Sequence, residues 1–511
     1  MIGRFLAFPT EILVKVRPAC IVLSQVATSQ NEDGTAGTCL RTHPSLLICF
    51  LSSMAIQSIN PANGKLLRNF DALTEAALSE KIALADEIFR TYPAVPLDHR
   101  ALWMNKLASL LEQEADEIAP ILTLEMGKPI HAARQEVAKC ATACRYYAEN
   151  ASRILASKAI VTENSSYIRW DPLGIILAIM PWNFPFWQVF RFLAPALMAG
   201  NVGLLKHAPN VPQCALLIES LVRRSGFPRG SFQTLLIETS QVESVLADPR
   251  IAAVTLTGSV TAGRAIGAQA GWLIKKSVLE LGGSDPFIVL PSADLDEAIQ
   301  TAVQARLVNN GQSCIAAKRF IIHESIYDLF EQRFVAGMEA MKIGDPMKED
   351  TDIGPLAGAR FAETLESQVH AAVQAGARVL TGGQRMLGDG FYFEPTVLVD
   401  VPRSSDIYRE ELFGPVAMLF KVSSLDEALA IANDTPFGLG ASAWTREPAE
   451  QQRLVAELQA GSVFINAMVA SDPRLPFGGI KNSGYGRELS AMGMREFLNA
   501  KTVVLATAHL H

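Results

Sequence analysis

The strongest constraint on the fold is a repeated alternation between short apolar runs and longer helix-like stretches. The runs GIILAIMPW, NVGLLKH, FQTLLI, AAVTLTG and DPFIVL follow one another through residues 174–290. A second series follows Cys314, namely KRFIIHE, ARVLTGG, YFEPTVL, GPVAMLFKV and GSVFIN. Because strands that alternate with helices build parallel doubly wound sheets, we expect two α/β units that meet near the cysteine, with a nucleotide crevice at the strand ends.

A helical segment precedes the first series. From about residue 73 to 156, apolar side chains recur at helical spacing among many Ala, Leu and Glu residues. The stretch SYIRWDPLG that follows alternates apolar and polar residues, which is typical of an exposed strand. The sequence therefore predicts helices, then this strand, then the first sheet.

Composition favours a large buried core and excludes some classes of partner. The 511 residues are 49% hydrophobic and 19% charged, with a formal net charge of -7 and no run rich in Lys and Arg. Binding to nucleic acid needs a clustered basic face, so we expect no nucleic-acid partner. The apolar run LLICFLSSMAI is too short to span a bilayer, and we expect no membrane partner either.

The cysteines predict no disulfide framework. There are seven, an odd number without regular spacing, which indicates a reducing compartment and hence a cytoplasmic protein. Cys140 and Cys144 lie one helical turn apart, but no His or second cysteine pair accompanies them. Helix packing is the favoured interpretation of this pair, and no metal site is predicted.

Residues 1–53 differ from the rest of the chain. They mix short apolar patches with Pro, Ser and Thr, show no sustained period and do not look like a packed domain. We favour a start codon assigned too early, with Met54 as the true start. The alternative is an organelle-targeting extension, against which Glu11, Glu32 and Asp33 argue, because transit peptides are poor in acidic residues.

Cys314 is the first candidate for chemistry, in the segment NNGQSCIAAKRF. A Gly-containing turn ahead of a helix start would supply backbone N–H groups that favour a thiolate. A single cysteine is more often inert core, so this segment alone is weak support for catalysis.

Glu280 is the second candidate, at the end of an apolar strand and just before Gly282 and Gly283. Apolar surroundings raise the pKa of a carboxyl group, which suits a general base, and the glycines let a ligand approach the backbone. The alternative is a strand-end Glu in a salt bridge.

Asn183 is the third candidate, between Pro181 and Pro185 in IMPWNFPFWQ. The prolines restrict the backbone, so the amide is held in one direction, as an oxyanion donor must be. The alternative is an Asn that caps the next helix.

The segment LTGSVTAG is the fourth candidate, with Gly258, Ser259 and Gly263 after a strand. Its spacing departs from the dinucleotide fingerprint GxGxxG, so by itself it only weakly indicates a phosphate-binding turn.

Together these segments resemble the NAD(P)-dependent aldehyde dehydrogenase family. The resemblance runs from about Ser58 to Val504, starts near the family's usual beginning at Met54, and rests on PWNFP, GNVGLLKHAP, TGSVTAG, LELGGSDP, NNGQSC, EELFGPV, ANDTPFGLGASAW and PFGGIKNSGYGRE. The order of these stretches and the separation between Glu280 and Cys314 agree with the family. The resemblance implies an α/β aldehyde dehydrogenase fold, with a Rossmann-like cofactor domain, an α/β catalytic domain and a small β oligomerisation arm.

The resemblance also implies domain boundaries. Residues 1–53 form an atypical extension, and residues 54–285 the cofactor-binding domain with an oligomerisation strand inserted at about 158–172. Residues 286–480 form the catalytic domain, and residues 481–511 return to the cofactor domain and end in an oligomerisation tail. A homodimer or homotetramer is implied.

The roles implied by the resemblance are those of a thiol-dependent oxidation. Cys314 corresponds to the nucleophile, Glu280 to the general base, and Asn183 to one oxyanion donor beside the Cys314 backbone N–H. An aldehyde would be oxidised through a thiohemiacetal and a thioester on Cys314, with NAD or NADP as cofactor. The implied cofactor-binding residues are Trp182, Lys206, Gly258, Ser259, Gly263, Glu411 and Phe413.

Within the family, KHAPNVPQCA, GSDPFIVL and PWNFPFWQVFRF are most similar to the short bacterial succinate-semialdehyde dehydrogenases. Arg191 lies about two helical turns after Asn183, so both side chains can face one tunnel. Its guanidinium would bind the far carboxylate of the substrate, assisted by Ser471. Arg306 ranks lower for this role, and a structural ion pair is the alternative for Arg191. Glutarate semialdehyde and aminobutyraldehyde are alternative substrates.

Two positions depart from patterns found in parts of the family. Pro209 stands three residues past Lys206, where NAD-preferring relatives often carry a glutamate that would repel a 2'-phosphate, so we expect both NAD and NADP to be accepted. Ala316 stands where some animal relatives carry a second cysteine, so their disulfide switch is not expected. A CoA-acylating enzyme and an inactive scaffold protein are rival interpretations. Glu280 argues against the first, and the presence of Cys314, Glu280 and Asn183 argues against the second.

Overall fold

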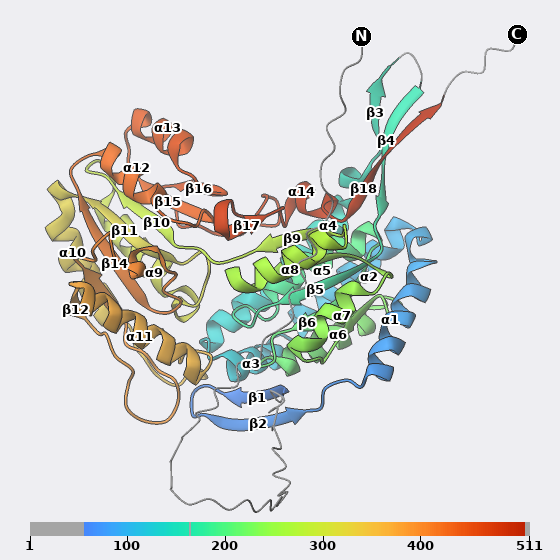
Figure 1. Cartoon of the computed structure of the whole chain (residues 1–511), viewed down its shortest axis with the longest axis horizontal. Helices are drawn as coiled ribbons and strands as arrows, with labels where there is room; N and C mark the ends of the chain where they lie inside the picture. Colours follow the sequence, from blue (N-terminus) through green and yellow to red (C-terminus); the bar gives the residue numbers. More distant parts are fainter. Residues whose placement is uncertain (1–55, 163–164, 506–511) are drawn as a thin grey trace, which may run out of the picture. The chain divides into compact units, whose positions relative to one another are not determined.

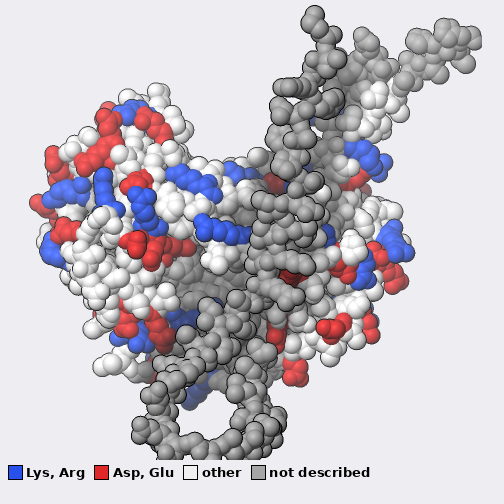
Figure 2. All heavy atoms as spheres, viewed as in Figure 1, with Lys and Arg blue, Asp and Glu red and all other residues white. Residues whose placement is uncertain are grey.

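The structure is a computed structural model of the chain, and it describes residues 56–162 and 165–505. The predicted extension over residues 1–53 and the predicted start at Met54 lie outside the described residues. Among the described residues, no helix has both the length and the apolar character needed to cross a bilayer. Basic and acidic side chains are interspersed on the described part of the face in Figure 2.

A hairpin and four helices open the described chain (Figure 1). They are β1 (Ile56–Asn60), β2 (Lys65–Phe70), α1 (Glu75–Phe89), α2 (Leu97–Gln113), α3 (Ala115–Met126) and α4 (Ile130–Leu155). The Thr74 hydroxyl caps α1 by accepting from the Ala77 N–H at 3.2 Å. The predicted helical segment is confirmed. The hairpin was not predicted, although its turn contains Asn63-Gly64, with Gly64 at a φ of 67°.

A six-stranded sheet forms the first α/β unit, in the order β17-β9-β8-β5-β6-β7. Strands β5 to β9 are parallel, and β17 joins the edge antiparallel to β9. Its strands are β5 (Ile175–Met180), β6 (Val202–His207), β7 (Phe232–Thr234), β8 (Ile251–Thr257), β9 (Lys276–Glu280) and β17 (Gly484–Tyr485). Its helices are α5 (Trp187–Ala199), α6 (Pro212–Ser225), α7 (Val242–Ala247) and α8 (Val260–Trp272).

A seven-stranded sheet forms the second α/β unit, in the order β12-β13-β14-β11-β10-β15-β16. Its strands are β10 (Asp285–Val289), β11 (Ala317–His323), β12 (Arg378–Thr381), β13 (Thr396–Val399), β14 (Val416–Val422), β15 (Gly440–Trp444) and β16 (Ser462–Ile465). Its helices are α9 (Leu295–Leu307), α10 (Glu324–Glu339), α11 (Ala359–Ala375), α12 (Leu425–Asn433) and α13 (Pro448–Glu457). Side chains alternate across this sheet, because Phe287 and Ile288 on β10 belong to different core clusters, as do Phe320 and Ile321 on β11.

A three-stranded sheet extends from the first unit (Figure 1). It consists of β3 (Lys158–Val161), β4 (Ser165–Pro172) and β18 (Leu498–Leu505), with α14 (Ser490–Arg495) just before β18. The stretch at about 158–172, where the sequence predicts an oligomerisation strand, thus holds two strands, and the chain's last described strand pairs with β4 along its whole length. Every residue of β3 is exposed.

One local expectation was wrong. Cys314 was expected just before a helix start, but the chain continues through a turn into β11. The apolar run KRFIIHE, which was predicted as a strand, does lie in β11, and pairing with β10 and β14 on both edges leaves no room for a helix before it.

Candidate active site

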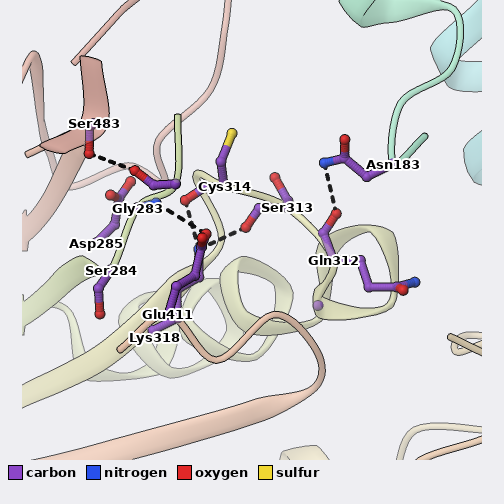
Figure 3. A network of polar contacts seen from close by, with 12 residues as sticks. Asn183, Gly283, Ser284, Asp285, Gln312, Ser313, Cys314, Lys318, Glu411 and Ser483 are labelled. Atoms are coloured by element: carbon purple, nitrogen blue, oxygen red, sulfur yellow. Dashed lines mark hydrogen bonds and ion pairs between the residues drawn. The ribbon is translucent and has the colours of Figure 1, made fainter. Parts of the chain in front are cut away.

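Cys314 lies in a tight loop between η3 (Val308–Gly311), a short 3-10 helix, and β11. Asn309, Asn310 and Gly311 all have positive φ angles, 57°, 58° and 73°. The buried Lys318 ammonium donates to the carbonyls of Ser313 at 2.8 Å and Cys314 at 2.7 Å. Figure 3 shows the Cys314 sulfur pointing away from Lys318. The loop is therefore held from one side while its thiol faces the other.

Cys314 is half-buried and forms no disulfide with a described residue. Burial raises its pKa to about 12, and the positive charges of Arg191 and Lys318 oppose that shift. At neutral pH the thiol of the free protein is therefore protonated. Attack on a carbonyl carbon requires the thiolate, so a base has to remove this proton.

Asn183 follows β5, and its amide points toward the cysteine loop (Figure 3). Its Nδ2 donates to the Gln312 carbonyl at 3.1 Å, and its Oδ1 accepts from Gln188 Nε2 at 3.1 Å. The second N–H of this amide makes no hydrogen bond to a described residue, and neither does the Cys314 backbone N–H. Since α5 begins at Trp187 with Phe186 at its N-cap, Asn183 is not a helix cap. One N–H of Asn183 and the backbone N–H of Cys314 are thus free to donate.

Glu280 ends β9 and is 2% exposed. Neither of its carboxylate oxygens has a hydrogen-bond partner among the described residues, and no salt bridge there includes it. Burial, reinforced by the negative charge of Glu488, raises the pKa of Glu280 well above its usual range. A buried, unbonded carboxyl group with a raised pKa is suited to take a proton from a thiol or from water.

Two glycines shortly after Glu280 make close approaches, Gly283 to backbone and Gly282 to a side chain. A Cβ on Gly283 would lie 2.7 Å from the Cys314 carbonyl oxygen, and one on Gly282 would lie 2.3 Å from Glu411 Oε2. The Gly283 N–H donates to Glu411 Oε1 at 3.1 Å (Figure 3). The segment between the two sheets therefore packs directly against the cysteine loop and Glu411.

The residues implied for cofactor binding lie at the carboxyl ends of neighbouring parallel strands in the six-stranded sheet. Trp182 comes after β5, Lys206 lies near the end of β6, Gly258 and Ser259 follow β8, and Glu280 ends β9. The carboxyl ends of parallel strands are where nucleotides bind in such sheets. The Gly258 N–H donates to the Glu280 carbonyl at 2.9 Å, which joins two of these strand ends.

The surfaces at this edge fit a nicotinamide dinucleotide. Trp182 lies against Phe413, with ring centres 5.8 Å apart, and offers a flat apolar wall. Lys206 is buried, which lowers its pKa, and it forms no ion pair among the described residues. The Thr257 hydroxyl is buried without a described partner, and Ser259 caps the N-terminus of α8, where phosphates bind well. At Gly263 a glycine is favoured by packing and not by the cofactor, since a Cβ there would lie 2.5 Å from Leu281 Cδ1.

Cys314 lines a cavity of about 210 Å³. Arg191 and Ser471, both expected at the substrate, line it, as do Lys139, Gln188 and the aromatic residues Phe184, Trp187 and Phe477. Sequence reasoning missed Lys139 and Gln188. Only the helical periodicity of α4, together with knowledge of which face packs on α5, would have placed Lys139 here.

Arg191 is 3% exposed and has protein partners on two sides. Its Nε lies 2.7 Å from Glu488 Oε2, and its Nη2 donates to Gln188 Oε1 at 2.6 Å. Arg191 therefore both forms a structural ion pair with Glu488 and lines the cavity. Arg306 does not line the cavity; its Nη2 donates to the Gly311 carbonyl at 2.7 Å, and burial lowers its pKa to about 9.

Cys140 and Cys144 are fully buried in α4, as helix packing requires. Burial raises the pKa of both thiols. Among the described residues no cluster of His, Cys, Asp and Glu side chains has the geometry of a metal site.

Comparison with known proteins places the chain in a family. The model of the aldehyde dehydrogenase family matches residues 50–503. An NADP(+) succinate-semialdehyde dehydrogenase of Mycobacterium tuberculosis is 55% identical over 457 residues, 89% of this chain and 100% of that protein. A probable enzyme of the same name from Synechocystis is 55% identical over 454 residues, again 89% and 100%.

The fold comparison agrees. The crystal structure of succinic semialdehyde dehydrogenase from Streptococcus pyogenes in complex with NADP+ has a TM-score of 0.87 and 37% identity, and covers 88% of this chain and 100% of that one. The chain belongs to the aldehyde dehydrogenase family, and the predicted family and fold class are confirmed.

Proposed function

We propose that this chain oxidises succinate semialdehyde to succinate with NADP+ or NAD+. The observation that carries the proposal is the cavity in front of Cys314, in which the apolar wall also presents the cationic side chains of Arg191 and Lys139 and the hydroxyl of Ser471. Such a cavity fits a short aldehyde with an anionic far end. The relatives from Mycobacterium and Synechocystis named above support the same substrate.

The first step forms a bond between Cys314 and the aldehyde carbon. Glu280 accepts the thiol proton and releases it to solvent, the sulfur attacks this carbon, and the former carbonyl oxygen becomes an oxyanion. Asn183 Nδ2 and the Cys314 backbone N–H donate to that oxyanion, and each such donor contributes about 3–4 kcal/mol to transition-state stabilisation. A bound nicotinamide cofactor supplies the acceptor for the hydride that then leaves the tetrahedral carbon.

The second step hydrolyses the thioester on Cys314. Glu280 takes a proton from a water molecule, the resulting hydroxide adds to the acyl carbon, and the C–S bond breaks to release the acid and the thiolate. The raised pKa of Glu280 makes it basic enough to accept this proton near neutral pH. A base in this position supports hydrolysis by water over transfer of the acyl group to CoA.

Cofactor choice follows from Pro209, just past β6. No carboxylate stands there to repel a 2'-phosphate, and the Streptococcus pyogenes structure contains NADP+. Lys206, Trp182, Ser259, Glu411 and Phe413 would hold the cofactor. We also propose a homodimer or homotetramer in which the sheet of β3, β4 and β18 makes the subunit contact; analytical ultracentrifugation tests this, and a monomer would contradict it.

The decisive experiment for the substrate is a panel of short aldehydes, three with four carbons and one with five. We expect kcat/KM to be highest for succinate semialdehyde, lower for glutarate semialdehyde, and lower by at least about tenfold for butanal and 4-aminobutanal, because only the first two carry a carboxylate. Absorbance at 340 nm with NADP+ and with NAD+ gives the rates. A higher kcat/KM for 4-aminobutanal would assign the enzyme to an amino aldehyde.

A further inference from the structure

Lys139 projects from α4 into the cavity that also contains Cys314, Arg191 and Ser471. The side chain is half-buried. Its Nζ donates to the Ser471 Oγ at 2.9 Å and lies 4.5 Å from the centre of the Trp187 ring. These neighbours are neutral, so neither balances the charge of the ammonium.

The other charged groups near the cavity are already paired. Arg191 lies 2.7 Å from Glu488, and the buried Lys128 bonds to Glu136. Asp472, the acidic neighbour of Ser471, is 2.6 Å from Arg474. Among the described residues no carboxylate lies within ion-pair distance of Lys139. One positive charge in the cavity is therefore uncompensated, which is costly in a partly buried site unless an anion binds.

Ser471 has a donor to spare at the same place. Its Oγ accepts from Lys139 Nζ at 2.9 Å and from Trp187 Nε1 at 3.0 Å, so both lone pairs are used. Its own O–H bonds to no described acceptor. A hydroxyl that accepts a hydrogen bond from a cation becomes a stronger hydrogen-bond donor. The Ser471 hydroxyl therefore also favours binding of an anion at this place.

We propose that the Lys139 ammonium, hydrogen-bonded to Ser471, adds a second positive charge beside Arg191 at the place where the distal carboxylate of the aldehyde binds. This inference rests on the proposed function and names a further residue that sets its substrate class. Lys139 touches substrate only at the end remote from the reacting carbon, so it governs KM more than kcat.

The protonation of Lys139 makes this subsite sensitive to pH. Burial and the charge of Arg191 lower the pKa of Lys139 to about 8. The titratable and charged groups around it are Arg191 on α5, Glu136 and Cys140 on α4, and Asp472 beyond β16. The cation that binds the carboxylate is thus present below about pH 8 and lost above it, whereas an arginine at this position keeps its charge.

The test replaces Lys139 and compares two aldehydes of equal length. Lys139→Met should raise KM for succinate semialdehyde about 10- to 100-fold and change KM for butanal less than about threefold. Lys139→Arg should retain most of the wild-type ratio of the two KM values. Lys106→Met, on the exposed side of α2, is the matched control and should leave both values unchanged.

A second measurement uses the folded wild-type enzyme and succinate as an inhibitor. Its inhibition constant should rise above about pH 8 in the wild type, and the rise should be smaller in Lys139→Arg. Equal pH profiles in the two proteins, or equal KM changes for both aldehydes in Lys139→Met, would overturn the proposal. If the wild type itself shows no preference for succinate semialdehyde over butanal, the proposed function fails first, and this outcome is distinct from a preference that survives Lys139→Met.

Discussion

The two sides of Cys314 are built in different ways. On the side of the six-stranded sheet, Glu280, Gly282 and Gly283 come from one strand end, and the cysteine loop packs against that segment through backbone atoms. On the cavity side, Lys139, Arg191 and Ser471 come from α4, α5 and the segment after β16, and Lys139 and Ser471 are 332 residues apart. The catalytic side is thus formed by short contiguous segments of the sequence. The substrate side forms only when distant segments pack together.

The largest expected effect is on Cys314, which belongs to both sides. Cys314→Ser should lower kcat/KM more than about a thousand-fold for charged and uncharged aldehydes alike, because a serine hydroxyl is a far weaker nucleophile. Absorbance at 340 nm measures the rate, and an unchanged unfolding midpoint shows that the fold is intact. A variant with a tenth of the wild-type activity would mean that no thioester forms on this residue.

The next variant tests whether the stability of the cavity side depends on the buried ion pair of Arg191 and Glu488. Arg191→Leu should lower the free energy of unfolding by about 3–5 kcal/mol, because Glu488 would keep a buried charge without its partner. The loss should shrink as the pH falls, since burial already raises the pKa of Glu488 and protonation then removes the charge. Denaturation in urea across pH measures both quantities.

The double variant Arg191→Leu with Glu488→Leu is the control for that experiment. It removes both charges and should recover most of the lost stability. If the single variant is as stable as the wild type at pH 8, the ion pair does not organise the cavity side.

A third variant tests the cofactor edge of the catalytic side. Pro209→Glu should raise KM for NADP+ about 10- to 100-fold and KM for NAD+ less than about threefold, because a carboxylate would repel the 2'-phosphate. Pro209→Gln has the same size without the charge and serves as the matched control. Equal effects on both cofactors would separate Pro209 from the phosphate.

The smallest effect concerns the backbone packing of the catalytic side. Gly283→Ala should lower the free energy of unfolding by about 1–3 kcal/mol, because its Cβ would lie 2.7 Å from the Cys314 carbonyl oxygen. Gly271→Ala in α8, where a Cβ meets nothing within 4 Å, should be neutral or slightly stabilising. Thermal unfolding of the two variants decides whether the close approach is real, and equal midpoints would contradict it.

The difference between the two sides explains what the sequence could predict. Local apolar runs predicted most strands of both sheets, and the segments around Asn183, Glu280 and Cys314 predicted the family because each is short and unbroken. The run KRFIIHE predicted the strand after Cys314, but the helix start expected just past the cysteine was wrong, since that segment's conformation depends on pairing with β10 and β14. The ion pair of Arg191 with Glu488 and the cavity position of Lys139 arise from segments far apart in the chain, and no local pattern encodes them.

The passage from β9 to β10 has a mechanical consequence. Residues 281–284 are the whole connection between β9 and β10; they directly follow Glu280, and Gly283 among them packs against the cysteine loop. A rotation of one sheet against the other would have to bend this short tether. A shearing of the sheets would therefore act on Glu280 through the chain itself and on the cysteine loop through the packing of Gly283 against Cys314.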